Sequence, residues 1–356
     1  MCKSGGVNTT TRRIGVGVVT VAAVALAAAG CGGSNSSGTT SASGHVGVLV
    51  GAGSTLVAPL VGAWQNDYQR TRGVEITYGA IGSGGGIAQI TARTVDFAGS
   101  DAPLTSDQKA ACKGCVMIPW ALAATTVAYN LPGVAGHLRL TGPVLADIYL
   151  GRVTAWNDPR IATLNPGAQL PARTIVVVRR SDPSGDTFAF TDYLSRVSSA
   201  WKQQVGGAST AVSWPTGTGA KGNAGVSGVI SQTPGAIGYV AIAQTIASHL
   251  GYALIRNRAG AYPVPGAKTI AAAAAAATFR PDNSTSLVNP PAAAPNAYPI
   301  STFTYAIVAK DSSKLAALKA FLDYAVGSGQ QFAAALSFAP LPKAVVVEDE
   351  SIVKGL

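Results

Sequence analysis

Residues 179–188 read RRSDPSGDTF and stand between two segments of different periodicity. The preceding run TIVVV, residues 174–178, is apolar and β-branched, which is typical of a buried strand. The following run AFTDYLSRV, residues 189–197, carries large apolar side chains at helical spacing: Phe190, Tyr193, Leu194 and Val197. The three segments predict a strand, a tight polar loop and the start of a helix.

The loop has the groups that hold an anion at a helix N-terminus. It offers a cation, hydroxyl donors and backbone N–H groups, in Arg180, Ser184, Gly185 and Thr187. It also carries two acids, Asp182 and Asp186, which repel an anion. The loop is interpreted as an anion cradle whose two carboxylates need a separate explanation.

The same order of strand, glycine-containing loop and helix occurs twice more. VGVLV at 46–50 precedes GAGST and a helical pattern, and VEITY precedes GAIGSGGG at 79–86. Thr55 and Ser83 thereby stand at helix starts beside glycines, as Ser184 does. Because Ser and Thr are also structural N-caps, one such loop is weak evidence. Three in one chain favour a shared anion site.

Asp101 follows a short predicted strand in VDFAGSDAPLTSDQK, residues 95–109. Thr105 and Gln108 have capping-box spacing for the next helix, so Asp101 precedes that cap and is free to point elsewhere. The alternative is a turn-forming aspartate.

The composition indicates a folded α/β protein. Of 356 residues, 47% are hydrophobic and 12% charged, which excludes extensive disorder and fits two domains. The net charge is +10, but the basic residues are scattered and only 7% of residues are aromatic. A nucleic-acid surface is therefore a poor interpretation.

The N-terminus has the features of an exported protein. Residues 1–30 combine a basic start with the apolar run 14–29, which is short for a membrane span and typical of a signal peptide. AAGC at 28–31 resembles a bacterial lipobox, which makes Cys31 the expected lipidation site; the alternative is an ordinary cleavage site with a chance cysteine. Residues 31–45 are polar and small, as in a flexible linker.

Two cysteines remain, Cys112 and Cys115 in CKGC. With no second CxxC and three histidines far apart, a zinc or other metal site is not expected. In an exported protein a local disulfide is favoured over a thioredoxin-type redox role.

Enzyme signatures are missing from the sequence. It has no GxxxxGK[ST] loop and no GxSxG elbow, and GSGGG lacks the spacing of a dinucleotide-binding loop. Few acids and histidines are present for a metal-dependent phosphatase. We expect a protein that binds an anion without transforming it and needs no cofactor.

The chain resembles the phosphate-binding lipoproteins (PstS family) of Pst-type ABC importers, most closely an actinobacterial subgroup. The resemblance covers nearly the whole mature chain and rests on the order and spacing of eight segments. These are GAGSTLVAPL (51–60), YGAIGSGGG (78–86), TVDFAGSDAPL (94–104), DIYLGRVTAWNDPRIATLNPGAQLP (147–171), VVVRRSDPSGDTFAFTDYLS (176–195), GAKGNAGV (219–226), PGAIGYV (234–240) and PLP (340–342).

The resemblance implies a periplasmic-binding-protein fold, with two α/β lobes, two chain crossings and a ligand cleft that closes about a hinge. Residues 46–128 and 299–356 would form lobe one, and residues 129–298 lobe two. A strand at 301–309 and a helix at 313–326 would return the chain to lobe one.

The resemblance also implies the roles of individual residues. Phosphate would be held by Thr55, Leu56 and Ser83 from lobe one and by Arg180, Ser184 and Gly185 from lobe two. Asp182 would orient the arginine, and Asp101 matches an acid common to the family. Asp186 stands where the best-known members have threonine, which leaves the hydroxyl contact of Thr187 in doubt.

The function that follows is capture of inorganic phosphate by a lipid-anchored monomer on the outer face of the cell membrane. The protein would deliver phosphate to the transmembrane permease of an ABC importer and would bind no nucleic acid. The alternatives are an oxyanion sensor or scavenger without a transporter and, third, a secreted phosphomonoesterase.

Overall fold

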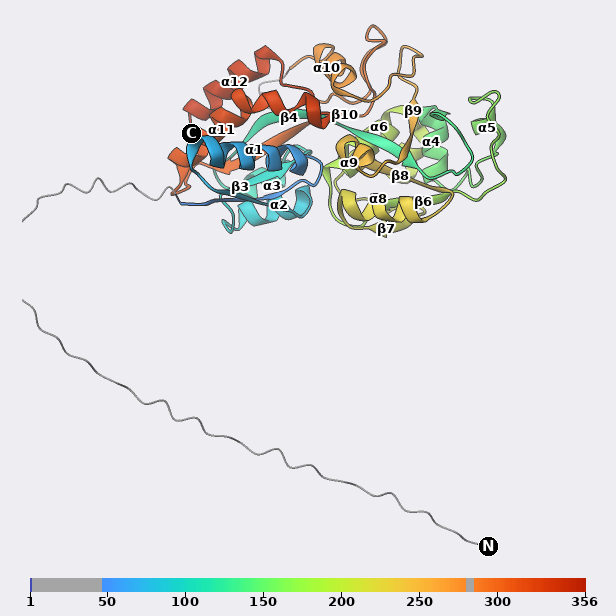
Figure 1. Cartoon of the computed structure of the whole chain (residues 1–356), viewed down its shortest axis with the longest axis horizontal. Helices are drawn as coiled ribbons and strands as arrows, with labels where there is room; N and C mark the ends of the chain where they lie inside the picture. Colours follow the sequence, from blue (N-terminus) through green and yellow to red (C-terminus); the bar gives the residue numbers. More distant parts are fainter. Residues whose placement is uncertain (2–46, 280–284) are drawn as a thin grey trace, which may run out of the picture. The chain divides into compact units, whose positions relative to one another are not determined.

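The computed structural model describes Met1, residues 47–279 and residues 285–356. Within these residues, ten strands form one branched sheet with helices packed against it (Figure 1). No helix of the described ranges is long and apolar enough to span a bilayer. Apart from Met1, the predicted signal peptide, the lipidation site Cys31 and the linker lie outside the described residues.

The first part of the sheet has the strand order β2-β1-β3-β10-β4, and we call it, with its helices, lobe one. Its strands are β1 (Leu49–Gly53), β2 (Ile76–Ala80), β3 (Phe97–Ser100), the start of β4 (Cys115–Tyr129) and β10 (Ser301–Ala309). Its helices are α1 (Ala58–Arg72), α2 (Ser83–Thr91), α3 (Ser106–Ala111), α11 (Leu315–Val326), α12 (Lys343–Lys354) and the 3-10 turns η1 (Ser328–Phe332) and η2 (Ala334–Leu336). Strands β1, β2 and β3 are parallel, whereas β10 runs antiparallel to β3 and β4.

The second part continues from β4 in the order β8-β6-β7, and we call it lobe two. Its strands are β5 (Arg139–Leu140), β6 (Val176–Arg180), β7 (Thr218–Ala220), β8 (Ala236–Ala241) and β9 (Gly251–Ile255). Its helices are α4 (Gly142–Tyr149), α5 (Pro159–Ala162), α6 (Gly185–Val197), α7 (Ser199–Gln204), α8 (Gly222–Gln232) and α9 (Ile242–Ala247). Helix α10 (Ala267–Ala275) packs on β4.

Strand β4 belongs to both lobes. It pairs with β10 up to Ala124 and with β8 from Thr125 onward, so one continuous strand makes the first crossing. The chain returns through residues 285–300 into β10, which is the second crossing. The structure confirms the expected arrangement of two α/β lobes joined by two crossings. The strand predicted at 301–309 is β10, and most of the helix predicted at 313–326 is α11.

The first strand lies further along the chain than its prediction. The sequence predicts a strand over 46–50 and a loop over GAGST, but β1 runs from Leu49 to Gly53. A Cβ on Gly51 would lie 2.2 Å from the Phe97 ring, and one on Gly53 would lie 2.1 Å from the Gly99 carbonyl oxygen. These glycines let β3 pair closely with β1, so the extended strand continues through them.

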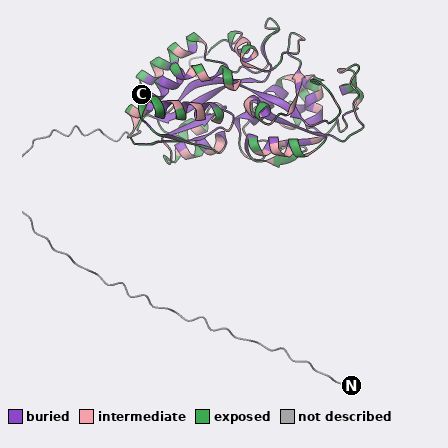
Figure 2. Cartoon of the chain, viewed as in Figure 1, coloured by how far each residue is buried: buried purple, intermediate pink, exposed green. Residues whose placement is uncertain are grey.

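The core of lobe one is built around aromatic side chains. Trp64 of α1 and Trp120 of β4 meet edge to face with ring centroids 5.2 Å apart, and Phe97 lies 6.1 Å from Trp120. Aromatic pairs in this geometry contribute about 0.5–1.5 kcal/mol beyond their buried area. Buried residues follow the sheet through both lobes (Figure 2).

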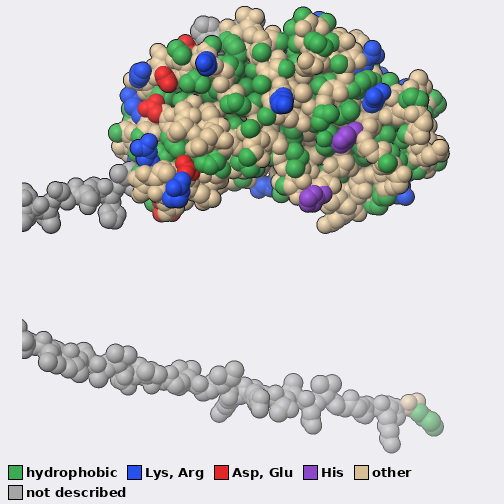
Figure 3. All heavy atoms as spheres, turned by 45° about the horizontal axis from the view of Figure 1, so that its top comes forward, with side chains coloured by type: hydrophobic (Ala, Val, Ile, Leu, Met, Phe, Trp, Pro, Cys, Tyr) green, Lys and Arg blue, Asp and Glu red, His purple; other side chains and the backbone are tan. Residues whose placement is uncertain are grey.

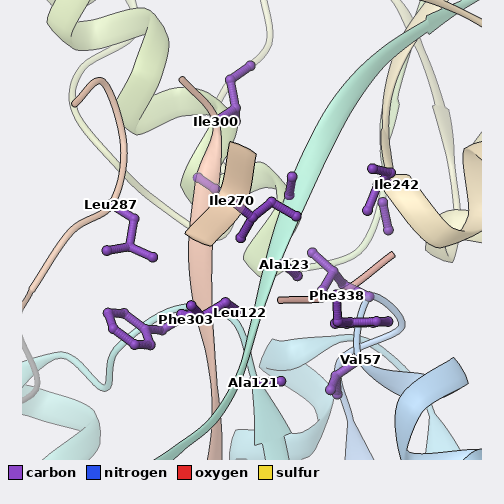
Figure 4. Close-up of a cluster of buried hydrophobic side chains, with 14 of the residues drawn as sticks. Val57, Ala121, Leu122, Ala123, Ile242, Ile270, Leu287, Ile300, Phe303 and Phe338 are labelled. Atoms are coloured by element: carbon purple, nitrogen blue, oxygen red, sulfur yellow. The ribbon is translucent and has the colours of Figure 1, made fainter. Parts of the chain in front are cut away.

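Apolar side chains also surround the crossing strands. Figure 4 shows Ala121 and Ala123 of β4 in a cluster of buried apolar side chains that also includes Ile242 of α9 and Ile270 of α10. These four residues belong to one continuous cluster of buried side chains. The crossing is therefore packed rather than loosely solvated.

The start of helix α3 and the residues after it behave as the sequence indicates. Thr105 and Gln108 form the predicted capping box. Cys112 and Cys115 form a disulfide with Cα atoms 5.5 Å apart, at the junction between α3 and β4.

Asp349 of α12 is a buried acid in the core of lobe one. Its side chain is fully buried, and neither carboxylate oxygen has a hydrogen-bond partner among the described residues. Burial, with a smaller contribution from Glu348, raises the pKa of Asp349 to about 8. The folded protein therefore keeps this proton at pH values where the unfolded chain has lost it.

We expect Asp349→Asn to remove a pH-dependent loss of stability. Because folding raises the pKa of Asp349, its stabilising effect is complete below about pH 4 and is lost as the pH rises toward 8. The free energy of unfolding of wild type relative to the variant should fall by up to about 1.4 kcal/mol per pH unit in this window. Urea unfolding of both proteins at several pH values measures it, and a constant difference contradicts the assignment.

Candidate anion-binding site

The opening stretch folds as predicted, into the end of β6, a loop and the start of α6. Ser184 is the N-cap of α6, and its hydroxyl accepts a hydrogen bond from the Thr187 backbone N–H at 3.4 Å. The N–H of Gly185, the first residue of this 13-residue helix, donates to Ser83 of lobe one, so the helix start faces the other lobe.

Arg180 is the cation of the site and is held from several sides. Its guanidinium donates to both carboxylate oxygens of Asp182, with Nε 2.8 Å from Oδ1, and its Nη1 lies 3.1 Å from Asp186 Oδ2. The hydroxyl of Tyr239 accepts from the Arg180 backbone N–H at 3.0 Å. Although burial opposes it, Arg180 lowers the pKa of Asp182 below its ordinary value. Charged and polar groups of its own lobe thus hold the guanidinium in one position.

Asp101 enters the site from lobe one, at the end of β3. Its Oδ2 accepts from the hydroxyls of Ser54 at 2.5 Å and Ser83 at 3.3 Å. Its Oδ1 is buried and has no partner among the residues that the structure describes. Burial, followed by the negative charge of Asp186, raises the pKa of Asp101 to about 8. Asp101 therefore retains an open acceptor in a region rich in donors.

The two lobes are in direct contact at this site. The Gly185 N–H of lobe two donates to the Ser83 hydroxyl at 3.1 Å, and the Gly84 N–H donates to the Pro183 carbonyl at 3.2 Å. Thr55 Oγ1 lies 3.3 Å from Arg180 Nη1. The described conformation is thus the closed one, in which residues of both lobes line one site.

Asp186 sits at the first turn of α6 and is almost fully buried. Its Oδ1 accepts from the Thr125 hydroxyl at 2.9 Å, and its Oδ2 accepts from Arg180 at 3.1 Å and Asn223 Nδ2 at 2.8 Å. Burial raises the pKa of Asp186, although Arg180, Asn223 and Thr125 each lower it. A carboxylate has about four acceptor positions, so one remains beyond these three bonds.

Most of the predicted site residues come together. Those found around Arg180 are Thr55, Ser83, Asp101, Asp182, Ser184, Gly185 and Asp186. Leu56 lies beside them, but its N–H donates to the Ser54 hydroxyl at 3.0 Å. The Thr187 hydroxyl lies 2.7 Å from that of Tyr239.

Three residues of the site were not predicted from the sequence. Ser54 binds Asp101 and lies in the quoted GAGST loop, next to the predicted Thr55. Asn223 is the second residue of α8, shortly after β7, and its amide donates to both Thr55 and Asp186. The strand, glycine and helix order of GTGAKGNAG could have indicated Asn223. No local signal marks Thr125, which lies in the middle of the apolar strand β4.

The site combines hydrogen-bond donors with hydrogen-bond acceptors. The donors are one guanidinium, hydroxyls and backbone N–H groups, and the acceptors are carboxylate oxygens that can accept a hydrogen bond from a ligand. Such a set suits a tetrahedral oxyanion that still carries a proton. In the described ranges, no group of three or more His, Cys, Asp and Glu side chains could hold a metal ion. Lys and Arg lie singly over the face drawn in Figure 3.

Comparison with known proteins agrees with this geometry. Residues 34–328 match a family model described as a PBP superfamily domain. The phosphate-binding protein PstS of Xylella fastidiosa is 42% identical over 305 residues, covering 85% of this chain and 83% of the relative. The chain belongs to the PstS family. PstS2 of Mycobacterium bovis is 35% identical over 338 residues, covering 86% of this chain and 87% of that relative.

Solved structures of phosphate-binding proteins have the same fold. PfluDING, a high-affinity periplasmic phosphate-binding protein bound with phosphate, superposes with a TM-score of 0.68 at 21% identity and covers 85% of this chain and 93% of that chain. A putative phosphate ABC transporter substrate-binding protein from Clostridium perfringens gives 0.61 at 17% identity, covering 83% and 100%. The periplasmic-binding-protein fold of the chain is therefore confirmed.

We expect Gly185→Ala to hinder closure of this PstS-family protein. A Cβ at Gly185 would lie 2.4 Å from Asp101 Cβ and 2.6 Å from its Oδ2, so the lobes must separate or the backbone must shift. Such overpacking costs about 1–3 kcal/mol, or roughly tenfold to hundredfold in affinity for an anion. Calorimetry and small-angle scattering with saturating phosphate as the probe measure both effects.

Gly228→Ala in α8 is the matched control, because a Cβ there meets no atom within 4 Å. In small-angle scattering, the Gly228→Ala protein should become more compact when phosphate is added, as wild type does. Equal contraction of Gly185→Ala would show that closure tolerates the added methyl group.

Proposed function

We propose that this protein captures inorganic phosphate outside the cytoplasm and delivers it to the permease of an ABC importer. The observation that carries the proposal is the buried Oδ1 of Asp101, an acceptor without a described partner beside the fixed guanidinium of Arg180. Membership of the PstS family supports the same ligand and transport role. The relatives named above are binding proteins rather than enzymes.

The open acceptor on Asp101 explains a preference for phosphate over sulfate. Above about pH 8, where Asp101 is ionised, phosphate still carries a proton and can donate to Asp101, whereas sulfate carries none. Sulfate must therefore bring a proton from solvent onto Asp101 or face an unpartnered carboxylate. Leaving such an acceptor unpaired costs at least about 1–3 kcal/mol, roughly tenfold to hundredfold in affinity.

The donors of the proposed site come from both lobes. Thr55, Leu56 and Ser83 would contribute hydroxyl or N–H groups from lobe one. Arg180 and the N-terminus of α6, with Ser184 and Gly185, would contribute the cation and the helix dipole from lobe two. Because each lobe carries only part of the set, ligand binding favours the closed conformation.

Asp186 is proposed as a second acceptor, through the one lone pair that its three protein donors leave open. Two acceptors would accommodate the dihydrogen form of phosphate as well as the monohydrogen form. Phosphate affinity should then persist as the pH falls from about 8 to 6, until the carboxylates themselves protonate. Asp101, whose Oδ1 has no described partner, should contribute more to selectivity than Asp186.

Above about pH 8, where Asp101 is ionised, we expect wild type to bind phosphate tightly and sulfate weakly in calorimetry of the mature domain, with arsenate as a third ligand. Sulfate binding should strengthen as the pH falls, because burial raises the pKa of Asp101 and a proton on Asp101 removes the repulsion. Asp101→Asn should reduce the phosphate-to-sulfate affinity ratio by about tenfold to hundredfold. Asp186→Asn should make phosphate affinity decline between pH 8 and 6.

Each outcome addresses a different part of the proposal. No phosphate binding by wild type refutes the function itself. If Asp186→Asn leaves the pH dependence unaltered and admits no sulfate, Asp186 is not a ligand acceptor and the two-acid account is wrong. Hydrolysis of a chromogenic phosphomonoester by wild type would instead favour the enzyme alternative.

We also propose that the mature protein is a monomer tethered to the outer face of the membrane through a lipid on Cys31. The proposal rests on AAGC at 28–31 and on the polar residues that follow it. Cleavage before Cys31 removes three positive charges and no acid, so the net charge falls from +10 to +7.

Replacing Cys31 with alanine should release the protein from the membrane fraction or leave it unprocessed. Detergent partitioning and the mass of the mature N-terminus measure the result. The substitution Ser34→Ala is the control for a change in the linker, and it should leave the detergent partitioning of the protein unaltered. If Cys31→Ala partitions as wild type does, the lipoprotein proposal fails.

A further inference from the structure

Thr125 lies where β4 changes from one lobe to the other. Its neighbour Ala124 pairs with Ser301 of β10, whereas Thr125 itself pairs with Ala241 of β8. The Thr125 N–H donates to the Ile300 carbonyl at 3.0 Å, and its carbonyl accepts from the Tyr298 hydroxyl at 3.2 Å. The backbone of this one residue therefore joins the first crossing to the second.

The side chain of Thr125 points to the anion site. Its hydroxyl is fully buried and donates to Asp186 Oδ1 at 2.9 Å. Asp186 Oδ2 is occupied by Arg180 and Asn223. The plane of the Asp186 carboxylate is therefore set by donors from three elements, of which only β4 runs through both lobes.

We propose that Thr125 is a positioning residue of the anion site, whose hydroxyl fixes the Asp186 carboxylate against Arg180 while its backbone fixes both chain crossings. The proposal rests on the proposed phosphate-binding function for its effect on affinity. It assigns a role in recognition to a strand residue that lies outside the cradle loops. The same contacts link the geometry of the hinge to the geometry of the carboxylate.

A hydroxyl at this position also affects the pKa of Asp186. The charged or titratable groups that interact with Asp186 are Arg180 of β6, Asp182 of the following loop, Asp101 of lobe one and Tyr239 of β8. The Thr125 hydroxyl is one of the donors that lower the pKa of Asp186 against the effect of burial. Without that donor Asp186 should take up a proton at a higher pH.

The next residue provides a matched control. Thr126 is equally buried and lies on the opposite face of β4, where its hydroxyl contacts the Val240 carbonyl at 2.9 Å and the Thr245 hydroxyl at 2.7 Å. Thr126→Val therefore removes a buried hydroxyl from the same strand and the same lobe without touching Asp186.

The test compares Thr125→Val, Thr125→Ser and Thr126→Val with wild type. Phosphate calorimetry between pH 6 and 8 should show about tenfold weaker binding by Thr125→Val. The pH at which phosphate affinity changes should be higher in Thr125→Val than in wild type. Thr125→Ser should restore affinity to within about threefold, and Thr126→Val should bind phosphate as wild type does even if it unfolds at a lower temperature.

A second readout does not depend on phosphate binding. The carboxyl carbon of Asp186, followed by NMR in ligand-free protein and assigned with Asp186→Asn, should titrate at a higher pH in Thr125→Val than in wild type. An unchanged Asp186 titration, or equal losses of affinity in Thr125→Val and Thr126→Val, overturns the proposal. Failure of wild type to bind phosphate refutes the proposed function alone, because the titration still tests Thr125.

Discussion

The constraint on which the structure depends is the burial of one guanidinium among three carboxylates. Arg180 is 3% exposed and is held by Asp182 and Asp186, while Asp101 approaches from the other lobe. Buried charges are costly unless each is paired or hydrogen-bonded, so the carboxylates need donors from neighbouring side chains. Ser54 donates a hydrogen bond to Asp101, and Thr125 and Asn223 donate to Asp186. Asp101 Oδ1 alone among the site's described carboxylate oxygens has no hydrogen-bond partner, and it favours an anion that carries a proton.

The fold brings these groups together by ending strands at one place. Asp101 follows β3, Arg180 ends β6, and Asn223 follows β7, so the carboxyl ends of strands from both lobes face one another. In α/β sheets such crevices are the usual place for ligands. Strand β4 keeps the two sheets in register because it is continuous through both. Hydrogen bonds therefore connect the crossing strands directly to the anion site.

Local sequence patterns predicted the elements well where the chemistry is local. The strand before Arg180, the N-cap at Ser184 and the capping box of α3 depend on residues a few positions apart. The first strand lies further along the chain than the local pattern predicts, because GAGST has the composition of a loop, whereas Phe97 and Gly99 of β3 need the space beside its glycines. That requirement comes from a strand more than 40 residues away.

The sequence by itself determined the α/β class, the cradle loops and the residue types that bind an oxyanion, because periodicity, helix starts and charge are local properties. Only the tertiary structure decided which acceptors are already occupied. Asp101 and Asp186 are equivalent candidates in the sequence, yet one keeps an open oxygen while the other accepts from three elements. Thr125 has no local signal at all, since its role comes from the meeting of β4, residues 298–300 and α6. Hydrogen-bond saturation depends on distances between segments far apart in the chain, and folding alone sets those distances.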